Sequence, residues 1–192
     1  MKVHEILTEN EVLDEARTAP LYHATSFKNA IGILSQNKIN GVTNQTITNQ
    51  LKKKYAAFKN STPNSFRGVS FTRDYNFAKA WAKDFGDEDL SGVTFVFDQE
   101  KMSRTFGKRL IPLNFYAYSN EYPEEERQKL RGQGTSENEE FLLGDLSNMN
   151  SFVTKIILYT TLRSNEEILN YGIPIQNANV LLNNPKLVKD SK

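Results

Sequence analysis

The stretch APLYHATSFKNAIGIL, residues 19–34, contains the strongest local signal in the chain. Pro20 opens a short apolar run typical of a strand, and Ser26 is placed to cap a helix whose apolar residues recur at helical spacing. His23, one of only 2 histidines in the sequence, therefore lies near the end of the predicted strand and just before the predicted helix. The question is what this histidine does at that junction.

Composition limits the classes of protein that the chain can represent. Its 192 residues suffice for one domain with its own core, and 38% hydrophobic and 11% aromatic residues indicate a globular protein. The formal net charge of +1 gives no global field that would attract nucleic acid or an anionic membrane. Without a long apolar run or a leader pattern, we expect a cytoplasmic protein and no membrane partner.

The order of patterns along the chain predicts a single α+β domain over residues 1–192, with strands dominating its second half. We expect its core over about residues 20–176. The remaining segments are predicted as an N-terminal helix at 8–17, a polar insertion at 37–67 and a loose C-terminal tail at 180–192. The oligomeric state is left open.

Apolar, β-favouring runs predict the other core strands, at residues 67–74, 91–98, 109–119, 139–146 and 151–161. After the first of them, Asp74 can cap a helix that carries Phe77, Trp81 and Phe85 at four-residue steps. Such a stripe is usually a helix face packed into a core, and it also suits an aromatic stacking surface. The sequence leaves both interpretations open.

Several common kinds of active site have no motif in this chain. The absence of cysteine excludes disulfides, thiol nucleophiles and cysteine-bound zinc. With 2 histidines and no HExxH pattern, we expect no metal site. The sequence also lacks GxxxxGK[ST], GxGxxG and GxSxG, the signatures of phosphate-binding loops and of a hydrolase nucleophile.

Three features remain, and they occur in a definite order. Leu21–Thr25 reads Leu-Tyr-His-Ala-Thr, Gly68–Thr72 reads Gly-Val-Ser-Phe-Thr, and Glu140–Leu143 reads Glu-Phe-Leu-Leu. Trp81 follows Ser70 by eleven residues. This series resembles the ADP-ribosyltransferase superfamily, in its His-Tyr-Glu branch, which includes diphtheria toxin and the poly(ADP-ribose) polymerases. The chain also resembles small proteins of large tailed phages that share the opening and the Ser-Phe-Thr-Arg strand.

The resemblance implies a fold of split, mixed β-sheets with flanking helices, and NAD+ as the substrate bound in a cleft between two sheets. It implies a mono-ADP-ribosyltransferase, a kind of glycosyltransferase, that releases nicotinamide and passes ADP-ribose to a protein or nucleic-acid acceptor. No metal is required. If the chain is encoded by a phage, the reaction belongs in the host cytoplasm.

The resemblance assigns the catalytic carboxylate to Glu140, which would bind the 2′-hydroxyl of the nicotinamide ribose and stabilise the developing positive charge. Glu139 is the alternative, because neighbouring side chains on a strand point to opposite faces and only one can enter the cleft. Ser70 would steady Glu140 or the ribose by a hydrogen bond. Both glutamates are also consistent with an exposed strand edge, and Ser70 with the solvent face of a strand.

The same resemblance assigns contacts with NAD+. His23 would bind the adenosine ribose, the backbone of Ala24 would hold the carboxamide, and Trp81 would stack on the nicotinamide ring. Thr25 and Phe71 complete the expected nucleotide-binding residues. A structural histidine is the alternative for His23.

Three positions differ from the family pattern. Ala24 replaces a glycine, Ser70 replaces a tyrosine, and Asn138 stands where arginine-modifying relatives carry Glu or Gln. These differences support a second hypothesis, an inactive module that keeps the fold and binds a nucleotide or protein. An RNA 2′-phosphotransferase relative is the third hypothesis. The basic run at 52–54 is either a solvated helix face or a contact with an acceptor.

Overall fold

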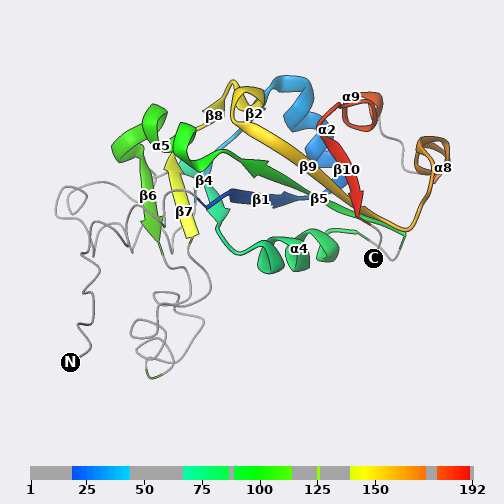
Figure 1. Ribbon diagram of the computed structural model, residues 1–192, viewed down its shortest axis with the longest axis horizontal. Coiled ribbons are helices and arrows are strands. Elements are labelled where there is room, and N and C mark those ends of the chain that lie inside the picture. Colours follow the sequence, from blue (N-terminus) through cyan, green and yellow to red (C-terminus); the bar gives the residue numbers. More distant parts are fainter. Residues whose placement is uncertain are drawn as a thin grey trace, which may run out of the picture.

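The computed structural model describes residues 19–43, 67–86, 89–113, 125, 139–171 and 177–190 (Figure 1). The expected N-terminal helix at 8–17, most of the polar insertion with its basic run at 52–54, and Asn138 lie outside the described residues.

The described strands form a mixed sheet of eight strands in the order β10-β9-β5-β1-β4-β7-β6, with β3 paired to β4. The strands are β1 Leu21–Thr25, β3 Val42–Thr43, β4 Arg67–Thr72, β5 Leu90–Phe97, β6 Leu110–Leu113, β7 Glu139–Leu143, β9 Val153–Thr160 and β10 Leu187–Asp190. A smaller sheet pairs β2 Lys38–Ile39 with β8 Leu146–Ser147. Together with the flanking helices, this arrangement confirms the predicted α+β class.

The large sheet has a narrow join between β1 and β4. These strands meet at one register pair, Tyr22 with Thr72, whereas β1 pairs with β5 along its whole length, from Leu21 opposite Phe97 to Thr25 opposite Val93. The sheet therefore consists of two parts, β10-β9-β5-β1 and β4-β7-β6, which, among the described strands, are joined only by the short pairing of β1 with β4. These two parts correspond to the split sheets expected from the sequence.

Helices cover both faces of the sheet (Figure 1). They are α2 Phe27–Gln36, α4 Tyr75–Asp84, α5 Gln99–Phe106, α8 Asn165–Asn170 and α9 Asn179–Leu182, with single 3-10 turns at η3 Gly107–Arg109 and η4 Met149–Ser151. Ser26 and Asp74 cap α2 and α4 as the sequence predicts, by accepting hydrogen bonds from backbone amides of the first turn. The main core lies on the α2 side, while α4 covers the opposite face.

Helix α4 does not bury its aromatic stripe. Its buried residues are Ala78 and Ala82, while Trp81 and Phe85 are 47% and 49% exposed. The helix packs too closely on β5 for large side chains, since a Cβ added at Gly92 would lie 2.6 Å from the carbonyl oxygen of Ala82. The interpretation of the stripe as a core face is therefore wrong.

The C-terminal segment also differs from the expected loose tail. Residues 187–190 form β10, which pairs in parallel with β9 from Leu187 opposite Ile156 to Asp190 opposite Tyr159. Strand β10 forms because it pairs with the outer edge of β9. Since the two strands are separated in the sequence, the local pattern of residues 187–190 does not predict this pairing. In the described part of the chain, no helix has the length and apolar character needed to cross a membrane.

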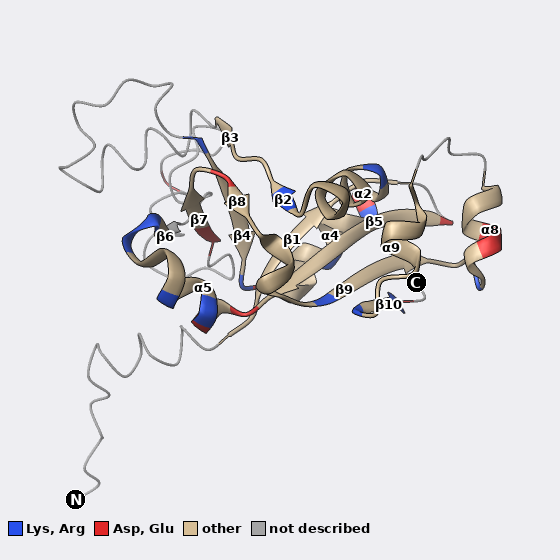
Figure 2. Ribbon diagram, turned by 90° about the horizontal axis from the view of Figure 1, so that it is seen from above, with Lys and Arg blue, Asp and Glu red and all other residues tan. Residues whose placement is uncertain are grey.

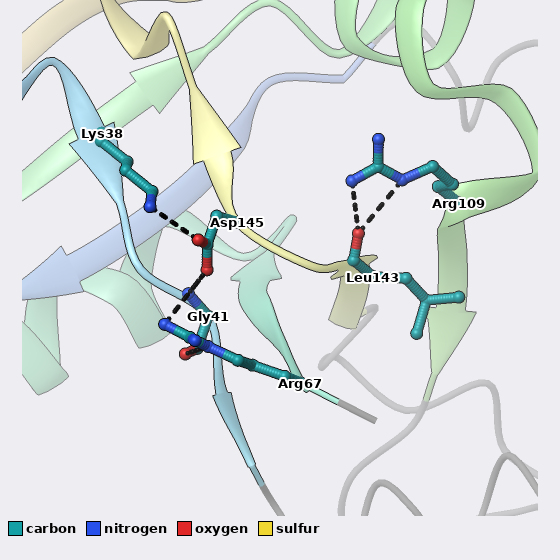
Figure 3. A network of polar contacts seen from close by, with 6 residues as sticks. All are labelled: Lys38, Gly41, Arg67, Arg109, Leu143 and Asp145. Atoms are coloured by element: carbon teal, nitrogen blue, oxygen red, sulfur yellow. Dashed lines mark hydrogen bonds and ion pairs between the residues drawn. The ribbon is translucent and has the colours of Figure 1, made fainter. Parts of the chain in front are cut away.

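A network of polar contacts holds the turn that follows β7 (Figure 3). Asp145 forms ion pairs with Lys38 at 2.7 Å and Arg67 at 3.3 Å. On the other side of the turn, Arg109 donates from Nε and Nη2 to the carbonyl oxygen of Leu143, at 3.2 and 2.7 Å. Figure 2 shows that other basic residues are spread from α5 to β9 and β10, in keeping with the net charge of +1.

Candidate active site

His23 lies at the join between the two parts of the sheet. Its Nδ1 is 2.9 Å from the carbonyl oxygen of Ser70, just beyond the Tyr22–Thr72 pair. A carbonyl oxygen can only accept, so Nδ1 carries the hydrogen and the neutral ring keeps Nε2 as an acceptor. Burial lowers the pKa of His23, and the bond to Ser70 opposes this only in part. The ring is therefore neutral at neutral pH and is held in one orientation across the join.

The two candidate glutamates belong to opposite faces of β7. Glu139 lies directly across from Thr72, and Glu140 lies directly across from Phe71. Because directly opposed residues share a face, Glu139 lies on the side of Thr72 and Ser70. Glu140 lies on the other side, with Phe71. The sequence argument that only one of them can enter a site is correct, and the structure separates their surroundings.

Glu139 is the glutamate beside Ser70. Burial raises the pKa of the half-buried Glu139 to about 7, while a hydrogen bond with the Ser70 side chain lowers that pKa in part. A carboxyl group that titrates near neutral pH is suited to acid–base or electrostatic work in a site. Ser70 thus contacts His23 through its carbonyl group and Glu139 through its hydroxyl group.

Glu140, the glutamate favoured from the sequence, has different surroundings. Only 4% of Glu140 is exposed, and its carboxylate forms an ion pair with Arg73. The structure does not bring Ser70 to Glu140, so the expectation that Ser70 steadies Glu140 is wrong. Sequence analysis missed Arg73. Its signal was present, because Arg73 follows Phe71 by two residues, the spacing that places a side chain on the same face of a strand.

The aromatic stripe of α4 is on the flank of the helix that faces away from the β9–β10 edge. Tyr75 and Lys79 both contact Asp190 of β10, at 3.2 and 2.9 Å, so this flank of α4 faces the β9–β10 edge. Phe77 and Trp81 lie about a quarter turn to the other side of the buried alanines. Given the strand order, their flank faces the β4–β7 part of the sheet.

That flank is on the same side of the sheet as Glu139. Tyr22 shares its face with the opposed Thr72, and Thr72 with the opposed Glu139. The Tyr22 ring packs against Tyr75 of α4, with ring centroids 5.7 Å apart. Trp81 leaves about half of its surface free and contacts the Phe77 ring at 4.8 Å between centroids. The aromatic flank of α4, Glu139 and the Ser70 hydroxyl group therefore lie on the same side of the sheet.

The other expected nucleotide contacts lie in the core or the backbone. Phe71 is 2% exposed and packs edge-on against Phe97, and Thr25 is 7% exposed. Their side chains are therefore buried, and their assignment as nucleotide contacts stays a prediction. Ala24 pairs with Thr94 of β5 and packs with Tyr22 on the α4 side. Among the described residues no group of three His, Asp or Glu side chains is arranged to hold a metal ion.

Comparison with known proteins identifies similarity only among solved structures. No family model matches the chain, and no curated protein matches it. The chain is similar to DarT of Thermus sp. 2.9 in complex with ADP-ribosylated single-stranded DNA, with a TM-score of 0.49 and 16% identity over 90% of this chain and 94% of that one. It is also similar to DarT in complex with NAD+, with a TM-score of 0.42 and 16% identity over 90% and 96% of the two chains.

The same comparison gives DarT in complex with carba-NAD+, with a TM-score of 0.41 and 16% identity over 91% and 94% of the two chains. DarT is an ADP-ribosyltransferase.

Proposed function

We propose that the protein is a mono-ADP-ribosyltransferase, which uses NAD+ to modify a macromolecular acceptor and releases nicotinamide. The observation that carries the proposal is the placement of Glu139, with its pKa of about 7, beside Ser70 and on the face of the sheet that α4 covers. The His23 side chain lies on the other face of the sheet, with its ring 5.8 Å from that of Phe71 between centroids, and is held at the join by the Ser70 carbonyl.

The chemistry of NAD+ suits this set of side chains. The bond between ribose C1′ and the nicotinamide nitrogen is weakened by the pyridinium charge, and its electrons leave with neutral nicotinamide. The ribose then develops oxocarbenium character, which a nearby carboxylate stabilises. We assign this carboxylate to Glu139, because its side chain is more accessible than that of Glu140 and lies with Ser70.

The remaining residues bind and orient in this proposal. The exposed face of Trp81 would stack on the nicotinamide ring and favour its positive charge. The neutral Nε2 of His23 can accept a hydrogen bond from a ribose hydroxyl. The acceptor attacks C1′ and gives up its proton to solvent or to Glu139. It is a protein or a nucleic acid, and no metal takes part.

A binding module without transferase activity is the second candidate. The same raised pKa favours it, because a Glu139 that is about half protonated at neutral pH carries only part of the charge that catalysis requires. In that case the aromatic flank and His23 would still bind a nucleotide.

The decisive experiment measures nicotinamide release and label transfer from labelled NAD+, with single-stranded DNA and cell-extract proteins offered separately as acceptors. Variants Glu139→Gln and Glu140→Gln are compared with the wild type, and Glu100→Gln on α5 is the matched control. We expect Glu139→Gln to lower release and transfer by about 100-fold or more, and Glu100→Gln to leave them unchanged.

Two results would contradict parts of this proposal. NAD+ binding by the wild type without release or transfer would leave only the binding module. Activity that survives in Glu139→Gln and disappears in a folded Glu140→Gln would return the catalytic role to Glu140, as the sequence motif suggests.

A further inference from the structure

The ion pair between Arg73 and Glu140 is more enclosed than the others found in the described residues. Their side chains are 16% and 5% exposed, whereas the Arg104–Glu100 pair on α5 is 77% and 58% exposed. An enclosed ion pair contributes little net stability, because removing two charges from water offsets most of their attraction. Its best-attested use is to fix one arrangement of the chain.

The position of Arg73 shows which arrangement this is. Arg73 directly follows β4, and the next residue, Asp74, is the N-cap of α4. Asp74 accepts hydrogen bonds from the amides of Asn76 and Phe77, at 2.8 and 3.1 Å. Its own amide donates to the Thr72 hydroxyl at 3.0 Å. With so short a connection, anchoring the Arg73 side chain anchors the first turn of α4.

The other contacts of α4 lead to the opposite part of the sheet. Ala82 approaches β5 at Gly92, and Lys79 contacts Asp190 of β10. Both strands belong to the β10-β9-β5-β1 part, while Glu140 belongs to β7. Helix α4 therefore packs on the β10-β9-β5-β1 part of the sheet, but the Arg73–Glu140 pair connects its start to β7 in the other part. Strand β7 also carries Glu139.

We propose that Arg73 and Glu140 are positioning residues, which hold the first turn of α4 on β7 and thereby set the position of the Phe77–Trp81 flank relative to the face that carries Ser70 and Glu139. The two neighbouring glutamates then have different roles. Glu139 faces the candidate active site, and Glu140 fixes the geometry of that site from the other side of the strand. The expected effect of the pair on NAD+ rests on the proposed function. The anchoring of α4 does not, because it is a property of the protein without ligand.

The first arm of the test follows amide hydrogen exchange in α4 without any ligand. Variants Glu140→Gln and Arg73→Gln are expected to speed exchange in the first turn of α4 about tenfold, with α2 unaffected. Glu139→Gln is the matched control on the same strand, and its α4 exchange should equal that of the wild type. Wild-type exchange in α4 of a folded Glu140→Gln would overturn the proposal.

The second arm separates positioning from catalysis and from folding. We expect Glu140→Gln to raise the KM for NAD+ about tenfold with little change in kcat. Arg73→Lys keeps the charge of the ion pair, so its KM should stay close to that of the wild type. The double variant Arg73→Met with Glu140→Leu removes both charges and should fold, yet keep fast α4 exchange and a raised KM.

Wild-type α4 exchange and KM in this double variant would overturn the proposal, because packing alone would then hold the helix. If the wild type does not turn over NAD+, the proposed function fails, and the exchange arm still decides the role of the pair.

Discussion

Glu139 and Glu140 are neighbours in β7, yet they lie on opposite faces of the sheet, Glu139 with Ser70 and Glu140 in an ion pair with Arg73. The two carboxyl groups consequently have different surroundings. Glu140 is compensated by a guanidinium group, whereas burial leaves Glu139 close to half protonation. This difference gives the candidate site its expected pH dependence.

The rate of nicotinamide release should follow the ionisation of Glu139. With a pKa of about 7, its ionised fraction rises about tenfold from about pH 6 to about pH 8, and kcat should rise with it and then level off. A pH profile of kcat measures this. A profile that is flat across this range would rule out Glu139 as the group that must be ionised.

Replacing Glu139 by glutamine should stabilise the protein at high pH. The pKa rises from an ordinary 4.5 to about 7 on folding, so between these values the folded state holds a proton that the unfolded state has lost. Wild-type stability therefore falls as the pH rises through this window. We expect Glu139→Gln to gain on the order of 1–3 kcal/mol at about pH 8 and little at about pH 4.5. Urea denaturation at both pH values measures the difference, and an equal effect at both would contradict it.

The imidazole of His23 should contribute stability as a neutral donor to Ser70. His23→Phe keeps an aromatic ring but leaves the carbonyl group without this donor, at an expected cost of about 1–3 kcal/mol in unfolding free energy. His23→Asn offers an amide donor near the position of Nδ1 and should therefore lose less unfolding free energy than His23→Phe. Because burial lowers the pKa of His23 in the folded state, wild-type stability should also fall below about pH 6.5, and His23→Asn should reduce that fall.

Trp81 and Phe85 provide a matched pair for nucleotide stacking. They lie on the same flank of α4 and are 47% and 49% exposed. Both alanine variants should change stability by less than about 1 kcal/mol, but Trp81→Ala should weaken NAD+ binding by about tenfold, as expected for a lost cation–π stack. Calorimetric titration measures the binding. Equal affinity in the two variants would remove Trp81 from the site.

Gly92 should be essential for the close packing of α4. A Cβ at this position would meet the carbonyl oxygens of Thr25 at 2.4 Å and Ala82 at 2.6 Å, and backbone atoms cannot move aside cheaply. We expect Gly92→Ala to cost about 2 kcal/mol or more. Gly32 in α2 has open space around it, so Gly32→Ala should stabilise by up to about 1 kcal/mol. Thermal denaturation compares the two, and a neutral Gly92→Ala would contradict the packing argument.

Much of the local structure could be predicted from the sequence because local chemistry decides it. Ser26 and Asp74 cap their helices as predicted, and the alternating residues of 91–98 form β5. For the stripe of Phe77, Trp81 and Phe85, the sequence left a core face and an exposed stacking surface both open, and the structure excludes the core face. Helical spacing alone cannot say which face is buried when the neighbouring strand leaves room only for alanine.

The sequence by itself determined the main strands, the capped helices after Ser26 and Asp74 and the α+β class, since each depends on neighbours within a few positions. Only the tertiary structure decided which glutamate faces Ser70, because the register of β7 against β4 sets the face of every residue in the strand. It also decided that Arg73 pairs with Glu140 and that residues 187–190 join the sheet, since these contacts link segments far apart in the chain.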